Sequence, residues 1–338
     1  MSAVVALVLA VAALPSLAAR AGGGRPPNPG PILAALAPVA ALLAIIAVVV
    51  AATATWWLAL LLTLPAATLV AWQLPPPRRI GRGPTAGPCS ASDPGLDVLT
   101  LRVLTLNVQG GAADPAAVLR SLRQHRVDVL VVQELTAETG RDLADARVAD
   151  LLPFCHLDPR PGSAGVGLWT RWPLIPLPPV PGLTAAAPRA SIDPAGGRPV
   201  TLTGVHPLAP VNGQEHQWHR ELALLKSALA DVSGPQVVAG DFNATRDHRS
   251  FRNLLAAGFL DCADAGRSRP WPGFTWPTDR RIPPVMRLDH VLVSRPGAAV
   301  LEARIVAIPG TDHRGVLAVI EFHPVGEFGS RPDLPPKQ

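Results

Sequence analysis

The hydrophobic pattern divides the chain into an apolar N-terminal part and a mixed remainder. Residues 2–19 are apolar apart from a proline at position 15, and a second run, 32–72, contains no charged residue. A membrane-spanning helix needs about 20 consecutive apolar residues. The second run therefore predicts two spans, near residues 32–52 and 55–73. The first run predicts a third span or a signal peptide, and we favour a span because basic residues do not precede it.

After this membrane region (residues 1–73), residues 74–97 are rich in Pro and Gly and predict a linker. Residues 98–323 alternate short apolar runs with polar segments, which indicates a single α/β domain. Residues 324–338 predict a flexible tail. Strands are expected near 99–106, 127–132, 165–170, 199–205, 236–239, 288–293, 301–308 and 316–322. Helices are expected to begin at Asp114-Pro115 and to lie near 138–150, 214–231 and 249–257.

Charge is distributed unevenly along the chain. Residues 1–92 contain no Asp or Glu, and their only basic residues are five arginines, which equal the net charge of +5. Removing those five from the 30 basic residues leaves 25, the same number as the acidic residues. A protein that binds nucleic acid through its phosphates usually carries a basic excess on the binding domain itself. The formal neutrality of residues 93–338 therefore disfavours a long polyanion as the substrate.

Polar side chains follow the predicted strands at the points where those strands end. Such positions are common sites of chemistry because a rigid sheet fixes the outgoing side chains. One isolated Asp at a strand end is usually a turn former or a helix cap. Six such groups in order are not explained that way, and they are Asn107, Gln133-Glu134, His206, Asp241 with Asn243, Asp289-His290 and Asp312-His313.

This ordered set resembles the endonuclease/exonuclease/phosphatase superfamily over most of residues 101–322. The resemblance rests on several motifs, namely Leu104-Thr-Leu-Asn107, Val132-Gln-Glu134, Gly204-Val-His206, Gly240-Asp-Phe-Asn243, Leu288-Asp-His290 and Thr311-Asp-His-Arg314. It implies a four-layered α/β sandwich, in which two packed mixed β-sheets are flanked by helices and the site lies at one end. Here the N-terminal transmembrane helices would precede that sandwich.

Phosphate-ester hydrolysis requires stabilisation of the phosphoryl oxygens while water attacks in line. A hard cation held by one or two carboxylates suits this task. We expect Mg²⁺, with Mn²⁺ as the alternative, and Glu134 as the first ligand; the resemblance adds Asn107 and Asp312 near the metal. Asp241 would orient or deprotonate the water, and Asn243 would donate a hydrogen bond to it or to the phosphate.

Two histidines complete the expected catalytic set. His206 and His313 would donate to phosphoryl oxygens, and a histidine needs a nearby carboxylate to stay protonated at neutral pH. The resemblance gives that part to Asp289, beside His313. Because neighbouring strand residues face opposite ways, His290 is more simply interpreted as structural. The aromatic segment 271–277 is equally consistent with a substrate-side loop and with a packed surface loop.

The membrane region suggests a lipid bilayer as a partner and a lipid-linked or other small phosphate ester or diester as the substrate. Arginine positions favour a cytoplasmic catalytic domain, whereas a resemblance to membrane-anchored superfamily members associated with glycopeptide resistance implies an extracytoplasmic one. We adopt the extracytoplasmic placement in a multi-pass cell-membrane protein. The rival hypotheses are a membrane-tethered nuclease, for which nucleic acid is the partner, and an inactive sandwich that binds a phosphorylated ligand.

Overall fold

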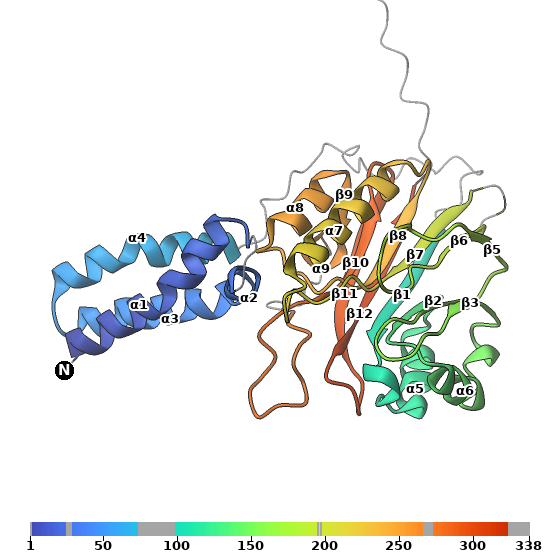
Figure 1. Ribbon diagram of the computed structural model, residues 1–338, viewed down its shortest axis with the longest axis horizontal. Coiled ribbons are helices and arrows are strands. Elements are labelled where there is room, and N and C mark those ends of the chain that lie inside the picture. Colours follow the sequence, from blue (N-terminus) through green and yellow to red (C-terminus); the bar gives the residue numbers. More distant parts are fainter. Residues whose placement is uncertain are drawn as a thin grey trace, which may run out of the picture.

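The computed structural model describes residues 2–24, 29–73, 99–194, 196, 198–265 and 273–323. A helical bundle projects from one side of a β-sandwich (Figure 1). The predicted linker and tail lie outside the described residues.

The bundle consists of α1 (Ser2–Ala21), α2 (Gly30–Ala35), α3 (Ala37–Ala52) and α4 (Trp56–Gln73). The run expected to form one helix over 32–52 is instead divided at Leu36, because Pro38 lies in the first turn of α3 and has no backbone N–H to continue the hydrogen bonding of α2. Among the described residues, α1 is the one helix long and apolar enough to cross a membrane by itself. A signal sequence near an N-terminus has the same properties.

Small residues form the interior of the bundle. The buried positions are mostly alanines, and the large apolar side chains point outward. Alanines allow helices to approach closely, as they do where transmembrane helices pack. The outward side chains that are at least 40% exposed include Val4, Leu7, Val11, Leu42, Val49, Trp56, Leu60 and Leu64.

The sandwich contains two six-stranded sheets. The first has the order β11 (Ala298–Ala307), β12 (Arg314–Phe322), β1 (Leu99–Asn107), β2 (Val129–Gln133), β4 (Val166–Thr170) and β3 (Phe154–Asp158). The second has the order β5 (Leu174–Leu177), β6 (Arg189–Ile192), β7 (Val200–Val205), β8 (Gln236–Asp241), β10 (Asp289–Ser294) and β9 (Phe259–Asp261). This arrangement confirms the predicted fold of two packed mixed sheets.

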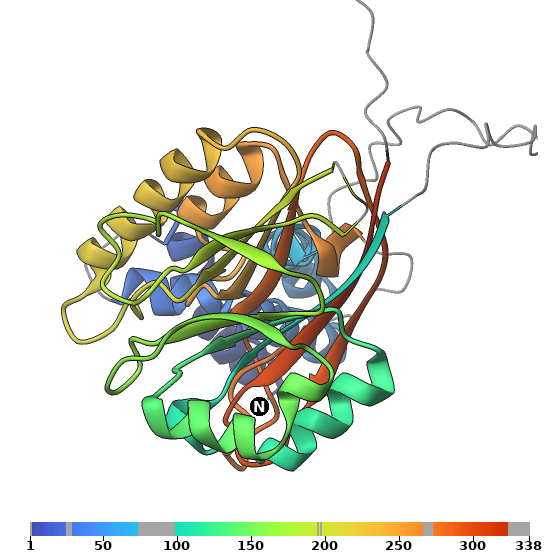
Figure 2. The same ribbon diagram turned by 90° about the vertical axis from the view of Figure 1, so that its right-hand side faces the viewer.

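Helices cover both outer faces (Figure 2). The first sheet is covered by α5 (Pro115–His125) and α6 (Ala137–Asp145), followed by the short helix η2 (Val148–Asp150). The second is covered by α7 (Glu215–Ala230) and α8 (Arg249–Ala256). Two short helices, η1 (Gln109–Gly111) and α9 (Cys262–Ala265), follow β1 and β9. As the sequence predicts, α5 begins at Pro115, and the Asp114 carboxylate caps it by accepting from the Ala116 amide.

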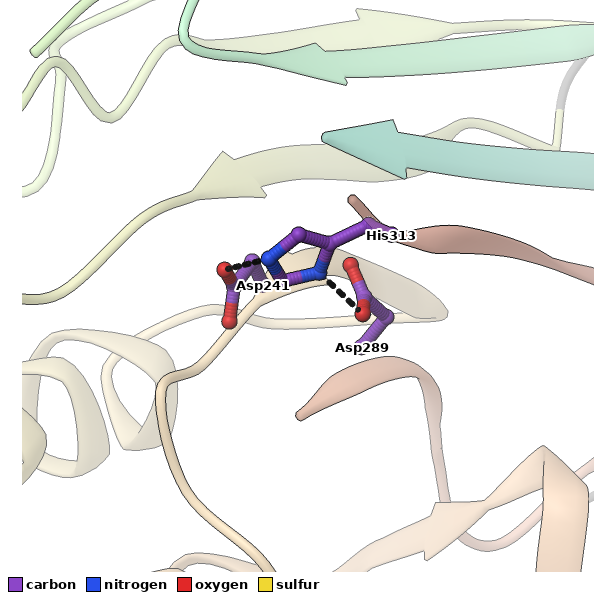
Figure 3. Close-up of side chains that lie close together, drawn as sticks. All are labelled: Asp241, Asp289 and His313. Atoms are coloured by element: carbon purple, nitrogen blue, oxygen red, sulfur yellow. Dashed lines mark hydrogen bonds and ion pairs between the residues drawn. The ribbon is translucent and has the colours of Figure 1, made fainter. Parts of the chain in front are cut away.

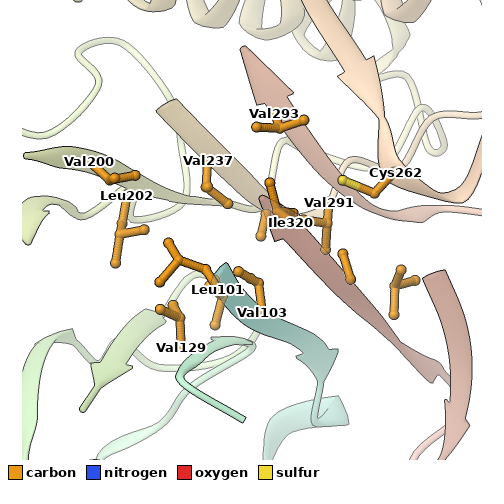
Figure 4. Close-up of a cluster of buried hydrophobic side chains, with 14 of the residues drawn as sticks. Leu101, Val103, Val129, Val200, Leu202, Val237, Cys262, Val291, Val293 and Ile320 are labelled. Carbon is orange, nitrogen blue, oxygen red and sulfur yellow. The ribbon is translucent and has the colours of Figure 1, made fainter. Parts of the chain in front are cut away.

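The core lies between the two sheets (Figure 4). Leu101 and Val103 from β1 meet Val237 from β8 and Val291 from β10 there. Alternate residues of each strand point into this layer, and the intervening residues face the flanking helices. The alternation matters for the site because it fixes which side chains point between the sheets where each strand ends.

Four strands were not predicted: β3, β5, β6 and β9. Three of them, β3, β5 and β9, are edge strands, and β9 has three residues. Edge strands are stabilised on one side only and are usually short. Their sequences, for example Leu174-Ile-Pro-Leu in β5, lack the continuous apolar run that identifies a central strand.

His290 belongs to a buried charge cluster on the outer face of the second sheet. Its Nδ1 donates to Asp261 Oδ2 at 2.8 Å and its Nε2 to the Ala244 carbonyl oxygen at 2.9 Å. Arg287 lies 3.6 Å from the same carboxylate. Burial alone would raise the pKa of Asp261, but the charges of His290 and Arg287 outweigh it and lower that pKa to about 2. This geometry agrees with the structural interpretation of His290.

We predict that Asp261→Asn destabilises the fold by about 3–5 kcal/mol, because removing one partner leaves buried charges uncompensated. Chemical denaturation of the two proteins would measure the difference. The control is Asp150→Asn, whose pair with Arg147 is exposed and is expected to contribute no more than about 1 kcal/mol. Because the folded pKa of Asp261 lies below its unfolded value, the stabilisation should be lost as pH falls from about 4 toward 2. Equal stabilities of the Asp261 variant and the parent would contradict this role.

Candidate active site

The candidate site lies at the edge of the sandwich where two parallel strand pairs end. In the first sheet β1 and β2 are parallel, and in the second β7 and β8 are parallel. Strands β10 and β12 run antiparallel to β8 and β1, so they start at this same edge. Asp289, the first residue of β10, pairs in register with Asp241, the last residue of β8.

Strand alternation directs several of the expected side chains between the sheets. Asn107 continues the inward series of Leu101 and Val103, and Asp241 continues that of Val237 and Ala239. Asp289 shares the inward face of β10 with Val291. Asn107, Asp241 and Asp289 are each no more than 1% exposed. These three residues, distant in sequence, therefore meet because each occupies an inward-facing position at the end of a strand, on β1 in the first sheet and on β8 and β10 in the second.

A chain of polar contacts is centred on Asp241 (Figure 3). The carboxylate Oδ2 of Asp241 lies 3.6 Å from His206 Nε2 and 3.7 Å from His313 Nε2. The other ring nitrogen of His313 donates to Asp289 Oδ2 at 2.8 Å. His206 Nδ1 donates to the Ser163 carbonyl oxygen at 2.9 Å. Both rings are thus held on two sides.

Asn107 connects this chain to Glu134. Its amide nitrogen donates to Glu134 Oε1 at 3.1 Å and to Asp241 Oδ2 at 3.2 Å. Its side-chain oxygen, Oδ1, accepts a hydrogen bond from the Gln109 backbone N–H at 2.9 Å. Asn107 therefore presents its donor group, and not its oxygen, to the two carboxylates. Asn107 therefore joins the carboxylate expected to bind the metal to the carboxylate expected to orient the water.

Three residues around the site adopt the left-handed backbone conformation, which is uncommon outside glycine. They are Gln109 (φ 49°), Glu134 (φ 59°) and Asn243 (φ 47°). Glu134 follows the inward-facing Gln133, so simple alternation would point it outward. Its positive φ changes the direction of the chain, and the carboxylate reaches Asn107. Backbone strain of this kind clusters at functional sites.

Electrostatics within the site favour charged histidines and an ionised Asp241. Burial opposes ionisation of Asp241, but the charges of His313 and His206 outweigh it and hold its pKa well below its usual value. Burial would likewise lower the pKa of His313, yet the Asp289 and Asp241 carboxylates raise it to about 10. Against the effect of burial, Asp241 and Glu134 raise the pKa of His206. Burial raises the pKa of Asp289.

Asp312 and Asn243 border the same cavity, but their side chains have different hydrogen-bond partners. Asp312 Oδ2 accepts the indole N–H of Trp276 at 3.0 Å. Asn243 donates its side-chain amide to the Pro207 carbonyl oxygen at 3.0 Å, and its backbone N–H to Asp241 Oδ1 at 2.8 Å. Trp276 therefore faces the site, which supports the substrate-side interpretation of the aromatic loop. Trp271 from that loop lies outside the described residues.

These groups form the polar floor of a cavity of about 490 Å³. The floor includes Glu134, His206, Asp241, Asn243, Asp312 and His313. The walls are mainly apolar, and they come from the segment after β7, from the segment before β10 and from the helical bundle. The cavity can therefore accommodate a charged group next to an apolar one.

The donor groups suit a hard divalent cation. Glu134 and Asp312 both line the cavity and offer carboxylate oxygens, the ligands that Mg²⁺ and Mn²⁺ accept. A second group, Asp241, Asp289 and His313, has donor atoms within 4.8 Å of one another. There His313 already contacts a carboxylate on each side, so this group is better explained as an internal ion-pair network. One oxygen of Asp289, Oδ1, is buried and has no hydrogen-bond partner among the described residues.

A model of the Endonuclease/Exonuclease/phosphatase family matches residues 104–313, more than half of the chain. The chain belongs to this family. Its members are phosphoesterases and nucleases, so the catalytic domain has the fold of a phosphoester hydrolase. No curated protein matches the chain in sequence.

Solved structures show the same fold at low sequence identity. A family protein from Leptotrichia buccalis gives a TM-score of 0.54 at 16% identity, over 66% of this chain and 100% of that one. The human Nocturnin catalytic domain with bound sulfate gives a TM-score of 0.53 at 18% sequence identity, over 67% of this chain and 97% of that one. D. rerio TDP2 humanized by 14 mutations gives a TM-score of 0.52 at 17% sequence identity, over 65% of this chain and 98% of that one.

The sequence did not identify several residues that support the site. Trp276 positions Asp312, and Gln109 Oε1 accepts the Asp312 backbone N–H at 3.0 Å. Thr275 Oγ1 accepts the backbone N–H of Asp289 at 3.3 Å. Gln109 lies two residues after Asn107, just beyond the end of the first motif. Thr275 and Trp276 belong to the aromatic segment 271–277, for which the sequence left a substrate-side loop and a packed surface loop equally open.

Proposed function

We propose that this protein is a membrane-anchored, Mg²⁺-dependent hydrolase of a lipid-linked or other small phosphate ester or diester, with Mn²⁺ as the alternative ion. The observation that supports it most is the contact chain that joins Glu134, Asn107, Asp241, His313 and Asp289 at the floor of the cavity. Carboxylates for a cation, charged donors for phosphoryl oxygens and a buried base thus border one space.

In the proposed reaction the substrate phosphate lies between the two histidines. Protonated His206 and His313 donate to phosphoryl oxygens, and Asp289 keeps His313 in the orientation that allows this. Ionised Asp241 orients the attacking water and accepts its proton. As the water oxygen bonds to phosphorus, the bond from phosphorus to the ester oxygen breaks, and the leaving oxygen takes a proton from solvent. When bound by Glu134 and Asp312, the cation would neutralise charge on the phosphate. Asn107 holds Glu134 and Asp241 at a fixed separation, and Asn243 fixes Asp241 through its backbone N–H.

The bundle supports multi-pass membrane anchoring. Large apolar side chains on α1, α3 and α4 are exposed while alanines fill the interior, the reverse of a water-soluble helical bundle. The three long helices pack side by side, and α1 begins at the end of the bundle far from the sandwich (Figure 1). We retain the extracytoplasmic placement of the catalytic domain as part of the proposal. Reporter fusions at the N-terminus and C-terminus would test it.

A membrane-tethered nuclease is the second candidate. One similar structure, D. rerio TDP2, is described as complexed with single-strand DNA product. The balance of 25 basic and 25 acidic residues outside the first 92 argues against a long polyanion here. The apolar walls of the cavity also suit a lipid-linked phosphate better than a nucleotide chain.

The deciding experiment is a substrate panel on the purified full-length protein in detergent, with Mg²⁺ and with a chelator. The panel contains polyprenyl phosphate, phospholipids, plasmid DNA and single-stranded DNA. We expect metal-dependent hydrolysis of a lipid phosphate. Faster cleavage of DNA would replace this proposal with the nuclease. Binding of phosphate esters without any turnover would favour the inactive sandwich.

Asp289→Asn is expected to move the alkaline limb of the rate profile to lower pH by at least about one unit, because an adjacent opposite charge shifts a pKa by roughly 1–3 units. In the parent, the pKa of His313 is raised to about 10, against burial, by Asp289 and Asp241. The protonated ring is therefore present below that pH and is lost as pH rises through it. Rates of parent and variant between pH 6 and 11 would measure the shift. If the alkaline limb of the variant lay at the same pH as that of the parent, Asp289 would not be the residue that keeps His313 protonated.

A further inference from the structure

The N-terminal bundle contributes part of the active-site wall. Pro31, Ile32 and Ala35 of α2 line the same cavity as the catalytic residues. Pro31 and Ala35 are buried, and Ile32 is 36% exposed. No motif of the phosphoesterase domain includes this segment, because residues 104–313 carry the family match.

Three residues between the last turn of α1 and the first turn of α2 contact the sandwich. Arg20 Nε donates to Asp247 Oδ1 at 2.6 Å in a largely buried ion pair. The Gly23 carbonyl oxygen accepts the Arg249 backbone N–H at 2.9 Å. The Pro31 carbonyl oxygen accepts from His248 Nε2 at 2.8 Å. These contacts fix α2 against the start of α8.

His248 is a buried, neutral element of this attachment. Its Nδ1 accepts the Thr245 backbone N–H at 2.9 Å, which leaves the proton on Nε2 for Pro31. Burial lowers the pKa of His248 to about 4. Gly24 allows the close approach, since a Cβ there would lie 2.7 Å from His248 Cδ2. The position of α2 is therefore defined by specific contacts and not by the chain connection alone.

The part of the cavity wall that α2 forms is apolar, and so are the residues near it. Within the cavity it is joined by the apolar segment 208–211 that follows β7. In the other direction it belongs to a bundle whose outer surface is apolar. An apolar chain attached to a phosphate beside the catalytic residues would thus meet apolar side chains of α2 and of segment 208–211 in the same cavity.

We propose that α2 determines substrate specificity, with Ile32 contacting the apolar chain of an amphiphilic phosphate ester. This inference rests on the proposed function and adds to it the residues that recognise the substrate outside the phosphate. Both an isoprenoid phosphate and a phospholipid have the required chemistry, namely an apolar chain close to a phosphate.

The test compares Ile32→Asp and Ile32→Ala with the parent, as full-length proteins in detergent with Mg²⁺. Farnesyl phosphate and dioctanoyl phosphatidic acid are the amphiphilic substrates, and glycerol phosphate is the soluble comparator. Loss of a single apolar contact in a hydrophobic pocket lowers kcat/KM by roughly tenfold or more. We expect that loss for at least one amphiphile and an unchanged rate for glycerol phosphate. The amphiphile affected identifies the chain type.

Leu33→Asn is the matched control, because Leu33 belongs to the same short helix but does not line the cavity. Binding of decylphosphonate, followed as a rise in Tm with a chelator present, gives a second measurement that needs no turnover. The rise should be smaller for both Ile32 variants. Equal rates and equal binding in parent and variants, or an equal loss on every substrate, would overturn the role of α2. If the parent hydrolysed neither these monoesters nor any lipid of the substrate panel, the proposed function would be rejected instead.

Discussion

Replacing Asp241 with Asn is expected to lower kcat by roughly 10²–10⁴-fold, the usual contribution of a positioned acid or base. Asp241 is 1% exposed and lies within 3.7 Å of His206 and His313. The substitution removes the proton acceptor and one of the charges that keep both rings protonated. KM should change little, because these effects arise mainly in the transition state. Steady-state kinetics on the substrate identified by the panel would measure them.

Asp231→Asn is the control for this variant, since Asp231 is exposed at the end of α7. An equal Tm for the two variants and the parent would separate catalysis from folding. A kcat within about threefold of the parent, a change smaller than the loss of any positioned acid or base, would show that Asp241 has no part in the chemistry.

The site could be anticipated from the sequence because strand ends are visible in it. The strand that carries Asn107 alternates apolar with polar residues, and those that carry Asp241 and Asp289 contain short apolar runs; each of the three polar residues stands at a strand end. A parallel pair brings such ends to one edge of a sheet. The meeting of these side chains thus follows from strand order, which the family motifs imply.

Other features depend on contacts between distant loops and carried no such signal. Trp276 reaches Asp312 through a loop whose course no periodicity describes. Glu134 was expected to emerge from a buried strand, but the backbone conformation that directs it toward Asn107 is not encoded by residue type, because Glu has no preference for positive φ. The edge strand β5 has four residues and contains a proline, so its sequence does not show the pattern of a strand.

The contribution of α2 to the cavity was the least predictable part of the molecule. Ile32 was interpreted only as the start of a membrane span, and Pro31 preceded that span. Their contact with the site depends on His248 and Asp247, more than 200 residues away in the sequence. Hydropathy indicates which residues avoid water, but not which protein surface they contact.

Replacing Glu134 with Gln is expected to abolish Mg²⁺-dependent hydrolysis and to weaken binding of the ion. Glu134 is the carboxylate that lines the cavity beside Asn107 without an ion-pair partner of its own among the described residues. Hard divalent cations are bound in proteins chiefly through carboxylate oxygens, so a neutral amide of the same shape is a poor replacement. Loss of an interaction needed in the transition state should appear as a fall in both kcat and kcat/KM.

Ion binding can be measured directly by titrating Mn²⁺ into the parent and the variant and following its paramagnetic resonance signal. Glu138→Gln is the matched control, because Glu138 lies four residues later on the exposed face of α6. It should bind Mn²⁺ and turn over substrate as the parent does. If Glu134→Gln kept the affinity of the parent for Mn²⁺ but lost activity, Glu134 would act on the substrate or the water and the cation would be held by other carboxylates of the cavity. If it kept both, the cation site would have to be assigned elsewhere, and Asp241, Asp289 and His313 would be the next group to test.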